Sequence, residues 1–413
     1  MSINRIRPAL LAGVAAGLAV SAIPAQAQNV DTAAPAAASD SAGLGDIVVT
    51  AERRSENLQR VPVSVAAVGG ADLRNFQAAG EDILALSGRV PSLYVETTTG
   101  RIFPRFYIRG LGNVDFYLGA SQPVSIIQDD VVLEHVVLKS NPVYDVAQVE
   151  VLRGPQGSLF GRNTTAGIVK FDTVQPSATW RGQGSASWGS RNSVNIDAGV
   201  GGPLNSSGTL SFRLSGLYQH RDNWISNTYT GPSDDGTVPG KNVMGGFNER
   251  DVRLQIEAKP SDALTLRLSG HYRDYDGTAS IFYRGSIKQG VRAVPDTLDL
   301  TKVSYDEAQN NPQAYKTKGA SLKAIYDFGG ITLTSITAYE NAHGYSRGDT
   351  DGGAAVDFGG TAPNYCAAGC GQSRGVLRGL DQWSQELRLA SPDSGRFKWQ
   401  IGGIYFDSRD MTE

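Results

Sequence analysis

The sequence is poor in cysteine, histidine and net charge, and it has no long apolar run. Its 413 residues include two cysteines and four histidines, and the formal net charge is −3. This charge does not indicate a basic surface for nucleic acid. Beyond the N-terminal segment, no apolar stretch approaches the roughly 20 residues of a membrane-spanning helix. A chain of this kind can cross a membrane only with β-strands, whose alternation hides lipid-facing residues from average hydropathy.

Motifs of catalysis and of cofactor binding are also missing. The four histidines are dispersed, so they indicate no metal cluster. No Ser-His-Asp or paired-carboxylate arrangement follows from the spacing. The sequence therefore predicts no enzyme activity, no metal site and no cofactor. It does contain 49 glycines and 16 tyrosines, a profile typical of many glycine-punctuated strands.

Residues 1–27 have the pattern of a secretory signal peptide. Arg5 and Arg7 form a basic start, residues 9–23 an apolar core, and Ala25-Gln26-Ala27 a small-x-small cleavage site. The apolar core is too short and too rich in alanine and glycine for a transmembrane anchor. We therefore expect export, with a mature chain that begins near Gln28.

Residues 28–58 are predicted to be a flexible linker, because their alanine, proline and acidic residues bury too little apolar surface to fold. Near its end lies a β-prone segment suited to adding as an edge strand to a partner's sheet. This segment consists of Asp46, Ile47, Val48, Val49 and Thr50. The alternative is that it forms the first strand of the domain that follows.

A glycine-rich run at residues 149–169 reads VEVLRGPQGSLFGRNTTAGIV. Its valines favour a strand, and the step Arg153-Gly154-Pro155 must then turn. Three further glycines suit positive φ or close backbone approach, namely Gly157, Gly161 and Gly167. A phosphate loop is not indicated, because no Lys-Ser/Thr pair follows Gly161, and no G-x-G-x-x-G is present. From its residues alone, the run is a compact structural turn.

Residues 59–173 have a globular pattern of short strands and helical turns. Strands are predicted at 61–65, 107–110 and 125–131, and helical turns at 71–76 and 81–86. Gly88 and the Val90-Pro91 step follow the second helical turn, as expected where a helix ends. These elements predict an α+β domain.

From residue 179 onward, apolar and polar residues alternate with period two in about nine segments. They lie near 180–188, 194–200, 210–220, 252–258, 264–272, 320–326, 331–339, 383–389 and 397–405. Short turns alternate with long polar loops at 222–249, 275–318 and 341–380, which is the pattern of outer-membrane barrels. A soluble β-sandwich is the alternative, although such long loops at every second connection are uncommon there. We expect residues 179–413 to form part of an antiparallel transmembrane β-barrel.

The motifs together resemble the TonB-dependent outer-membrane receptors, and siderophore receptors among them. Residues 149–169 are similar to the signature near the end of that family's plug domain, with Ala166 at a position that is often glycine. The Ile108-Arg109-Gly110 step resembles a second plug motif, and residues 128–131 a third, with Asp130 in place of its usual glycine. Plug signature positions matched here are Arg109, Gly110, Arg153, Gly154, Pro155, Gly157, Gly161 and Asn163.

The resemblance implies a fold, a mechanism and a set of partners. It implies an α+β plug domain at 59–173 followed by an antiparallel barrel, and it makes Asp46 to Thr50 the TonB box. Implied partners are the energy-transducing protein TonB, outer-membrane lipid and an iron-chelate ligand. The chain has about nine strands against roughly 22 in plugged transporters, so we expect the N-terminal part of such a receptor.

Strand parity suggests a contact between the plug and the barrel wall. On the strand near 383–389, Glu386 falls on the face opposite the apolar residues, and Glu257 does so on an earlier strand. Arg–carboxylate pairs are favourable when partly desolvated. The hypothesis is a latch of Arg109 and Arg153 with Glu386 and also Glu257. Solvated lumen charges, worth little per pair, are the alternative.

Cys366 and Cys370 lie in the predicted long loop at 341–380. In an oxidising compartment a local disulfide between them is the default expectation, while a zinc site would need more cysteine or histidine nearby.

Three functions remain open at this stage. The resemblance implies TonB-dependent uptake of a bulky ligand, with a ferric siderophore as the commonest and cobalamin, carbohydrate or another metal chelate as rivals. A passive porin or adhesin would have neither TonB box nor plug. A truncated barrel fragment without transport activity is the third expectation.

Overall fold

The computed structural model describes residues 47–77, 82–113, 115, 118–140, 142–233, 235–283, 298–353, 372–392 and 396–413. The predicted signal peptide, most of the predicted linker, and both cysteines lie outside these residues. Among the described residues, no helix is both long enough and apolar enough to cross a membrane.

The N-terminal domain is built around a five-stranded sheet of order β3-β9-β10-β7-β8. Its strands are β3 (Val65–Gly69), β7 (Val124–Gln128), β8 (Val131–Leu133), β9 (Val146–Arg153) and β10 (Gly167–Thr173). β10 pairs in parallel with β7 and antiparallel with β9. Apart from Ala147, the apolar residues of β7, β9 and β10 are almost fully buried, so this sheet carries the domain's core.

Smaller elements complete the N-terminal domain. Its helices are α1 (Gly70–Gln77), η1 (Ile83–Leu86), α2 (Val136–Lys139) and α3 (Gly157–Phe160). A three-stranded sheet joins β4 (Leu93–Glu96), β5 (Arg105–Ile108) and β6 (Leu111–Gly112), and β1 (Val48–Val49) pairs with β2 (Glu56–Asn57). The predicted α+β domain is therefore present. Its predicted strand at 61–65 is wrong, because the strand begins only at Val65, after Pro62, which has no backbone N–H to donate.

The predicted single strand at 125–131 is instead a hairpin. β7 ends at Gln128, and Asp129 and Asp130 adopt φ values of 47° and 72° before β8 begins. Two consecutive positive φ values characterise the tight turn that matches the twist of paired strands. Arg109 and Gly110 form a similar turn between β5 and β6, with φ values of 53° and 80°.

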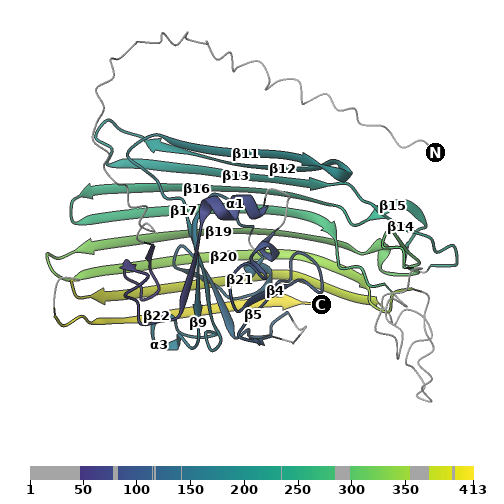
Figure 1. Ribbon diagram of the computed structural model, residues 1–413, viewed down its shortest axis with the longest axis horizontal. Coiled ribbons are helices and arrows are strands. Elements are labelled where there is room, and N and C mark those ends of the chain that lie inside the picture. Colours follow the sequence, from purple (N-terminus) through teal and green to yellow (C-terminus); the bar gives the residue numbers. More distant parts are fainter. Residues whose placement is uncertain are drawn as a thin grey trace, which may run out of the picture. The chain divides into compact units, whose positions relative to one another are not determined.

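A nine-stranded antiparallel sheet, here called the large sheet, follows in the order β11-β12-β13-β16-β17-β19-β20-β21-β22 (Figure 1). Its strands are β11 (Arg181–Gly189), β12 (Ser193–Pro203), β13 (Leu210–Arg221), β16 (Phe247–Ser261), β17 (Leu264–Thr278), β19 (Pro312–Asp327), β20 (Thr332–Asp349), β21 (Gln372–Ala390) and β22 (Gln400–Thr412). The predicted strands are confirmed. β11 and β22 are the two edges, so the described strands form an open sheet.

The two ends of the large sheet differ. At one end the connections are short, as at residues 328–331 between β19 and β20, where Gly329 and Gly330 have positive φ. At the other end the connections are long, apart from Ser190–Asn192 between β11 and β12. The long connections contain β14 (Ile225–Asn227), β15 (Gly240–Met244) and β18 (Lys302–Val303), which form a small sheet of their own. We call these the short-turn end and the long-loop end.

The large sheet buries polar side chains on one face and exposes apolar side chains on the other, which is the reverse of a water-soluble protein. Charged and polar side chains are buried on the face that covers the N-terminal domain, among them Asp197, Arg213, Arg253, Gln255 and Glu386. Apolar side chains of the same strands are exposed on the other face, including Val200, Leu214, Leu254, Leu268 and Leu387. Alternation of apolar-out and polar-in is the arrangement of strands that face lipid.

Candidate functional site

The glycine-rich run is a knot of turns between β9 and β10. Gly154 has φ 106°, and its N–H donates to the carbonyl of Ala166 at 2.9 Å. A Cβ atom on Gly167 would lie 2.2 Å from the carbonyl oxygen of Leu152, so only glycine fits there. Between these points α3 places Phe160, which is 2% exposed, against the core. The turns of this run thus hold Phe160 in place in the core.

The segment predicted as a partner-binding strand is docked on the N-terminal domain. Asp46 lies outside the described residues, but Val48 and Val49 form β1, which pairs with β2. Val49 is fully buried in a small apolar cluster with Ile127, Leu152, Phe160 and Ile168, whereas Ile47 and Val48 are about half exposed. One edge of this segment is thus already paired within the N-terminal domain.

Thr50 is fastened by two charged side chains. Its backbone N–H donates to Oε1 of Glu150 at 2.8 Å, and its hydroxyl donates to the same oxygen at 3.1 Å. Lys170 Nζ donates to the Thr50 hydroxyl oxygen. Glu150 lies on β9 and is fully buried, and its other oxygen has no hydrogen-bond partner. If the segment that contains Thr50 undocked, the buried carboxylate of Glu150 would lose two of its hydrogen bonds, which is costly for a buried charged group.

A five-charge cluster lies just beyond this segment, near the short-turn end. Arg53 Nη1 donates to Oδ1 of Asp130 at 2.9 Å, and its Nη2 donates to Oε2 of Glu386 on β21 at 3.2 Å. Lys323 on β19 donates to the other oxygen of Asp130 at 2.5 Å, and Arg388 donates to Glu386 at 2.6 Å. We call Arg53, Asp130, Lys323, Glu386 and Arg388 the Arg53 cluster. It joins the N-terminal domain to the large sheet.

The Phe160 ring packs against Arg53 of this cluster. The Arg53 guanidinium lies 4.2 Å from the centroid of the Phe160 ring, and its side chain is fully buried. A cation over an aromatic face is stabilised most when it is desolvated, as here. The glycine-rich run therefore contacts the Arg53 cluster through the ring of Phe160.

The structure pairs the residues of the hypothesised latch differently. Glu386 does contact the N-terminal domain, but through Arg53. Glu257 pairs with Arg267 and Lys259 of its own sheet. Arg153 donates to the carbonyl of Pro91 at 3.4 Å, and Arg109, in the turn after β5, has no ion pair among the described residues. At Glu386, the contact between the N-terminal domain and the large sheet is thus made by Arg53, and not by Arg109 or Arg153 as the hypothesis had it.

A second junction joins the N-terminal domain to the other side of the large sheet. Asp145, at the start of β9, is fully buried and accepts from Nε of Arg213 at 2.8 Å and from Gln183 at 2.6 Å. Arg253 donates to the carbonyls of Tyr144 and Asp145 at 3.0 and 3.2 Å. Burial would raise the pKa of Asp145, but hydrogen bonds from Arg213 and Ser215 hold it below its usual value. Asp145 is therefore a carboxylate anchored on β13.

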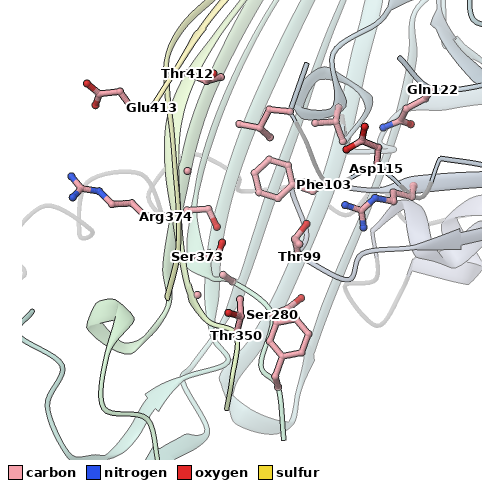
Figure 2. A pocket seen from close by; sticks show the side chains of 18 residues that line it. Thr99, Phe103, Asp115, Gln122, Ser280, Thr350, Ser373, Arg374, Thr412 and Glu413 are labelled. Carbon is pink, nitrogen blue, oxygen red and sulfur yellow. The ribbon is translucent and has the colours of Figure 1, made fainter. Parts of the chain in front are cut away.

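Two open spaces lie between the N-terminal domain and the long-loop end. The first, of about 280 Å³, has Thr99 and Phe103 of the domain on one side and Ser373 and Thr412 of the last strands opposite (Figure 2). The second, of about 580 Å³, is lined by three arginines, Arg89, Arg101 and Arg221, and one carboxylate, Asp82. Arg101 already pairs with Asp82 and with Glu249, at 3.6 and 3.2 Å. The guanidinium groups of the lining still outnumber its carboxylates, which favours an anionic guest.

Neither the disulfide nor a metal site can be placed. Cys366 and Cys370 lie outside the described residues, so their pairing stays a prediction. Within the part of the chain that the structure describes, no three His, Cys, Asp or Glu side chains are grouped to hold a metal ion.

Sequence reasoning missed Arg53, Asp130, Lys323, Glu150 and Asp145. One signal was visible for Asp130, because an aspartate replaced a motif glycine. The other four are ordinary charged residues whose partners lie about 70 to 330 positions away in the chain.

Comparison with known proteins identifies the N-terminal domain. The family profile described as "TonB-dependent Receptor Plug Domain" matches residues 57–168. The chain carries a TonB-dependent receptor plug domain. The resemblance predicted from the motifs is confirmed, and the N-terminal domain is called the plug from here on.

Relatives and solved structures agree with this assignment. The chain is 28% identical over 218 residues to the pesticin receptor of Yersinia pestis, covering 52% of this chain and 30% of the relative. It is 28% identical over 130 residues to the vitamin B12 transporter BtuB of Vibrio vulnificus, covering 31% of this chain and 20% of the relative. The chain thus spans less than a third of the length of these relatives.

Two solved structures share the fold. The ferric yersiniabactin uptake receptor FyuA of Yersinia pestis has a TM-score of 0.67 at 20% identity, covering 85% of this chain and 49% of that one. The ferric preacinetobactin receptor BauA of Acinetobacter baumannii has a TM-score of 0.62 at 13% identity, covering 88% and 50%. The predicted combination of a plug and antiparallel barrel strands is confirmed.

Proposed function

We propose that this chain is part of a receptor that actively transports a bulky ligand across the outer membrane. The observation that carries the proposal is a folded plug lying on the polar face of a sheet whose opposite face is apolar. A plug in that position blocks passive diffusion, so passage needs work to move it. An outer-membrane location follows from the same arrangement of faces.

The work would enter through residues 46–50 as the TonB box. A short, β-prone segment near the N-terminus suits recognition by strand addition. In the docked state Val48 O accepts from Gln148 at 3.0 Å and Thr50 N–H donates to Glu150. Binding of the energy-transducing partner TonB would therefore require the segment to leave the plug first.

The ligand is proposed to be an anionic iron chelate of the siderophore type. Three arginines line the larger space at the long-loop end, and Arg221 contributes one of them from the wall strand β13. Several structural neighbours are receptors named for ferric siderophores. An anionic chelate would match the arginine-lined space in charge.

Uptake of a radioactively labelled ferric siderophore by cells that express the receptor tests the function. Deletion of residues 46–50 should abolish energy-dependent uptake while leaving binding at the cell surface intact. Deletion of residues 33–37, in the alanine- and proline-rich segment, is the matched control and should leave uptake unchanged. Uptake that persists without residues 46–50, or in cells lacking the energy-transducing partner, would contradict the proposal.

A further inference from the structure

Asp130 occupies a position that glycine would fill without strain. Its φ of 72° lies in the left-handed region, and so does the φ of 61° of its partner Arg53. Residues with a Cβ adopt this region at a conformational cost. Asp130 is also where the chain departs from the resembled motif, which has glycine. Turn geometry alone therefore does not account for an aspartate at this place.

The Asp130 carboxylate joins three parts of the molecule. Its two oxygens accept from Arg53, three residues after Thr50, and from Lys323 on wall strand β19, while its own backbone belongs to the plug turn between β7 and β8. Burial would raise the pKa of Asp130, but Lys323 and Arg53 hold it well below its usual range. The group is therefore a permanent anion between two cations.

Removing that anion would unbalance the Arg53 cluster. The intact cluster has three cations, Arg53, Lys323 and Arg388, and two anions, Asp130 and Glu386. Without Asp130, three cations would share the single carboxylate of Glu386. The Arg53 side chain is fully buried, and its Nε already lacks a hydrogen-bond partner, so it could not recover the loss from water without moving.

We propose that Asp130 is a positioning residue that clamps Arg53 against the wall and so holds the adjacent segment, residues 47–50, in its docked state. The proposal rests on the proposed function in one respect, that residues 46–50 are the segment on which the partner pulls. The clamp makes release of that segment depend on the wall strand β19 as well as on the plug. A change in the wall that displaces Lys323 would then loosen the segment without touching it.

The test is the mobility of a nitroxide label at residue 48 in the intact protein, in lipid bilayers, without ligand or partner. Val48 is half exposed, so Val48→Cys can carry the label, in a background with Cys366→Ser and Cys370→Ser. Asp130→Asn keeps the size of the side chain and removes its charge. We expect on the order of a tenfold rise in the ratio of mobile to immobile label, as for loss of a charged hydrogen bond.

Two further variants separate the clamp from the turn. Asp130→Gly relieves the positive φ and also removes the charge, and it should mobilise the label as Asp130→Asn does. Lys323→Gln leaves the turn untouched and should mobilise the label in the same direction. Asn242→Gly is the matched control, because it relieves a φ of 56° on β15, at the long-loop end and away from the cluster, and it should change nothing.

Two results would overturn the clamp. The first is a label that stays as immobile in Asp130→Asn and Lys323→Gln as in the parent. The second is a label that Asp130→Gly orders further, which would mean that turn strain is the whole role of the residue. If Asp130→Gly fails to fold, the other two variants still decide. Because no transport is measured, the outcome is separate from that of the uptake experiment.

Discussion

At the scale of single residues, the plug core contains a lysine. Lys139 is 1% exposed, and its Nζ donates to the carbonyl of Val124 at 3.1 Å. Burial lowers its pKa to about 7, although Glu134 acts in the opposite direction. In an unfolded chain a lysine keeps its proton to about pH 10.4. Between these values the unfolded chain binds more protons than the folded plug, so plug stability should rise with pH.

Lys139→Met should remove this pH dependence. We expect the variant to raise the free energy of unfolding of the plug at pH 6 by about 2–4 kcal/mol, because it no longer buries a charge. The parent should gain stability between about pH 7 and pH 10, and the variant should not. The measurement is the urea midpoint for proteolytic cleavage within the plug of the intact protein, at several pH values. Lys241→Met, at an exposed position on β15, is the control. Parallel pH profiles for Lys139→Met and the parent would show that Lys139 is not responsible.

At the scale of elements, the start of β9 is tied to β13 by Asp145 and Arg213, both almost fully buried. A buried ion pair contributes little net stability, but removing one partner leaves an uncompensated charge. The substitution Asp145→Asn would keep the φ of 47° that Asp145 adopts, since asparagine tolerates the left-handed region. The pair can therefore be tested without disturbing the turn.

Asp145→Asn alone should destabilise the plug by about 3–5 kcal/mol, because Arg213 remains buried without its carboxylate. Combining it with Arg213→Met should restore most of the loss, since no charge is then left unpaired. The urea midpoint for cleavage within the plug reports both effects. If the double variant were as unstable as Asp145→Asn, the penalty would come from the lost hydrogen bonds to Gln183 and Ser215 instead.

The strands and helices were largely predictable, because the residue pattern within each segment determines them. Period-two alternation located all nine strands of the large sheet, but it ended β20 at Tyr339, whereas the strand continues to Asp349. Beyond Tyr339, Asn341 and His343 take positions on the face that was apolar, so the alternation stops although the backbone pairing does not. In the plug, residues 125–131 look like one strand because the Asp129–Asp130 turn contains no glycine or proline.

The contacts between elements were not predictable in the same way. Parity correctly placed Glu386 on the covered face, where it is 9% exposed. Its partner could not be read from parity, because Arg53 lies 333 positions earlier in a segment expected to be flexible. Such pairings depend on how the plug is seated against the sheet, which no local pattern encodes. The glycine-rich run was recognised, but its use as a support for Arg53 through Phe160 required the structure.

At the scale of the whole molecule, the two faces of the large sheet determine which side of it meets lipid. Along β21, Trp383, Leu387 and Leu389 are exposed, while Glu386 and Arg388, between them, are buried. A soluble sandwich would place these two sets the other way round, because exposed apolar side chains are unfavourable in water. The exposed set must therefore face lipid if the chain is stable.

The most direct test is a nitroxide scan of residues 384–389 in membranes, measuring collision with oxygen, which concentrates in lipid, and with a water-soluble nickel complex. If this strand faces lipid on one side and the plug on the other, oxygen accessibility should be high at 385, 387 and 389. Accessibility to both reagents should be low at 386 and 388, which the plug covers. Nickel accessibility at 387 as high as at an exposed position on β15 such as 241, or no alternation at all, would contradict a plug held against a lipid-facing wall.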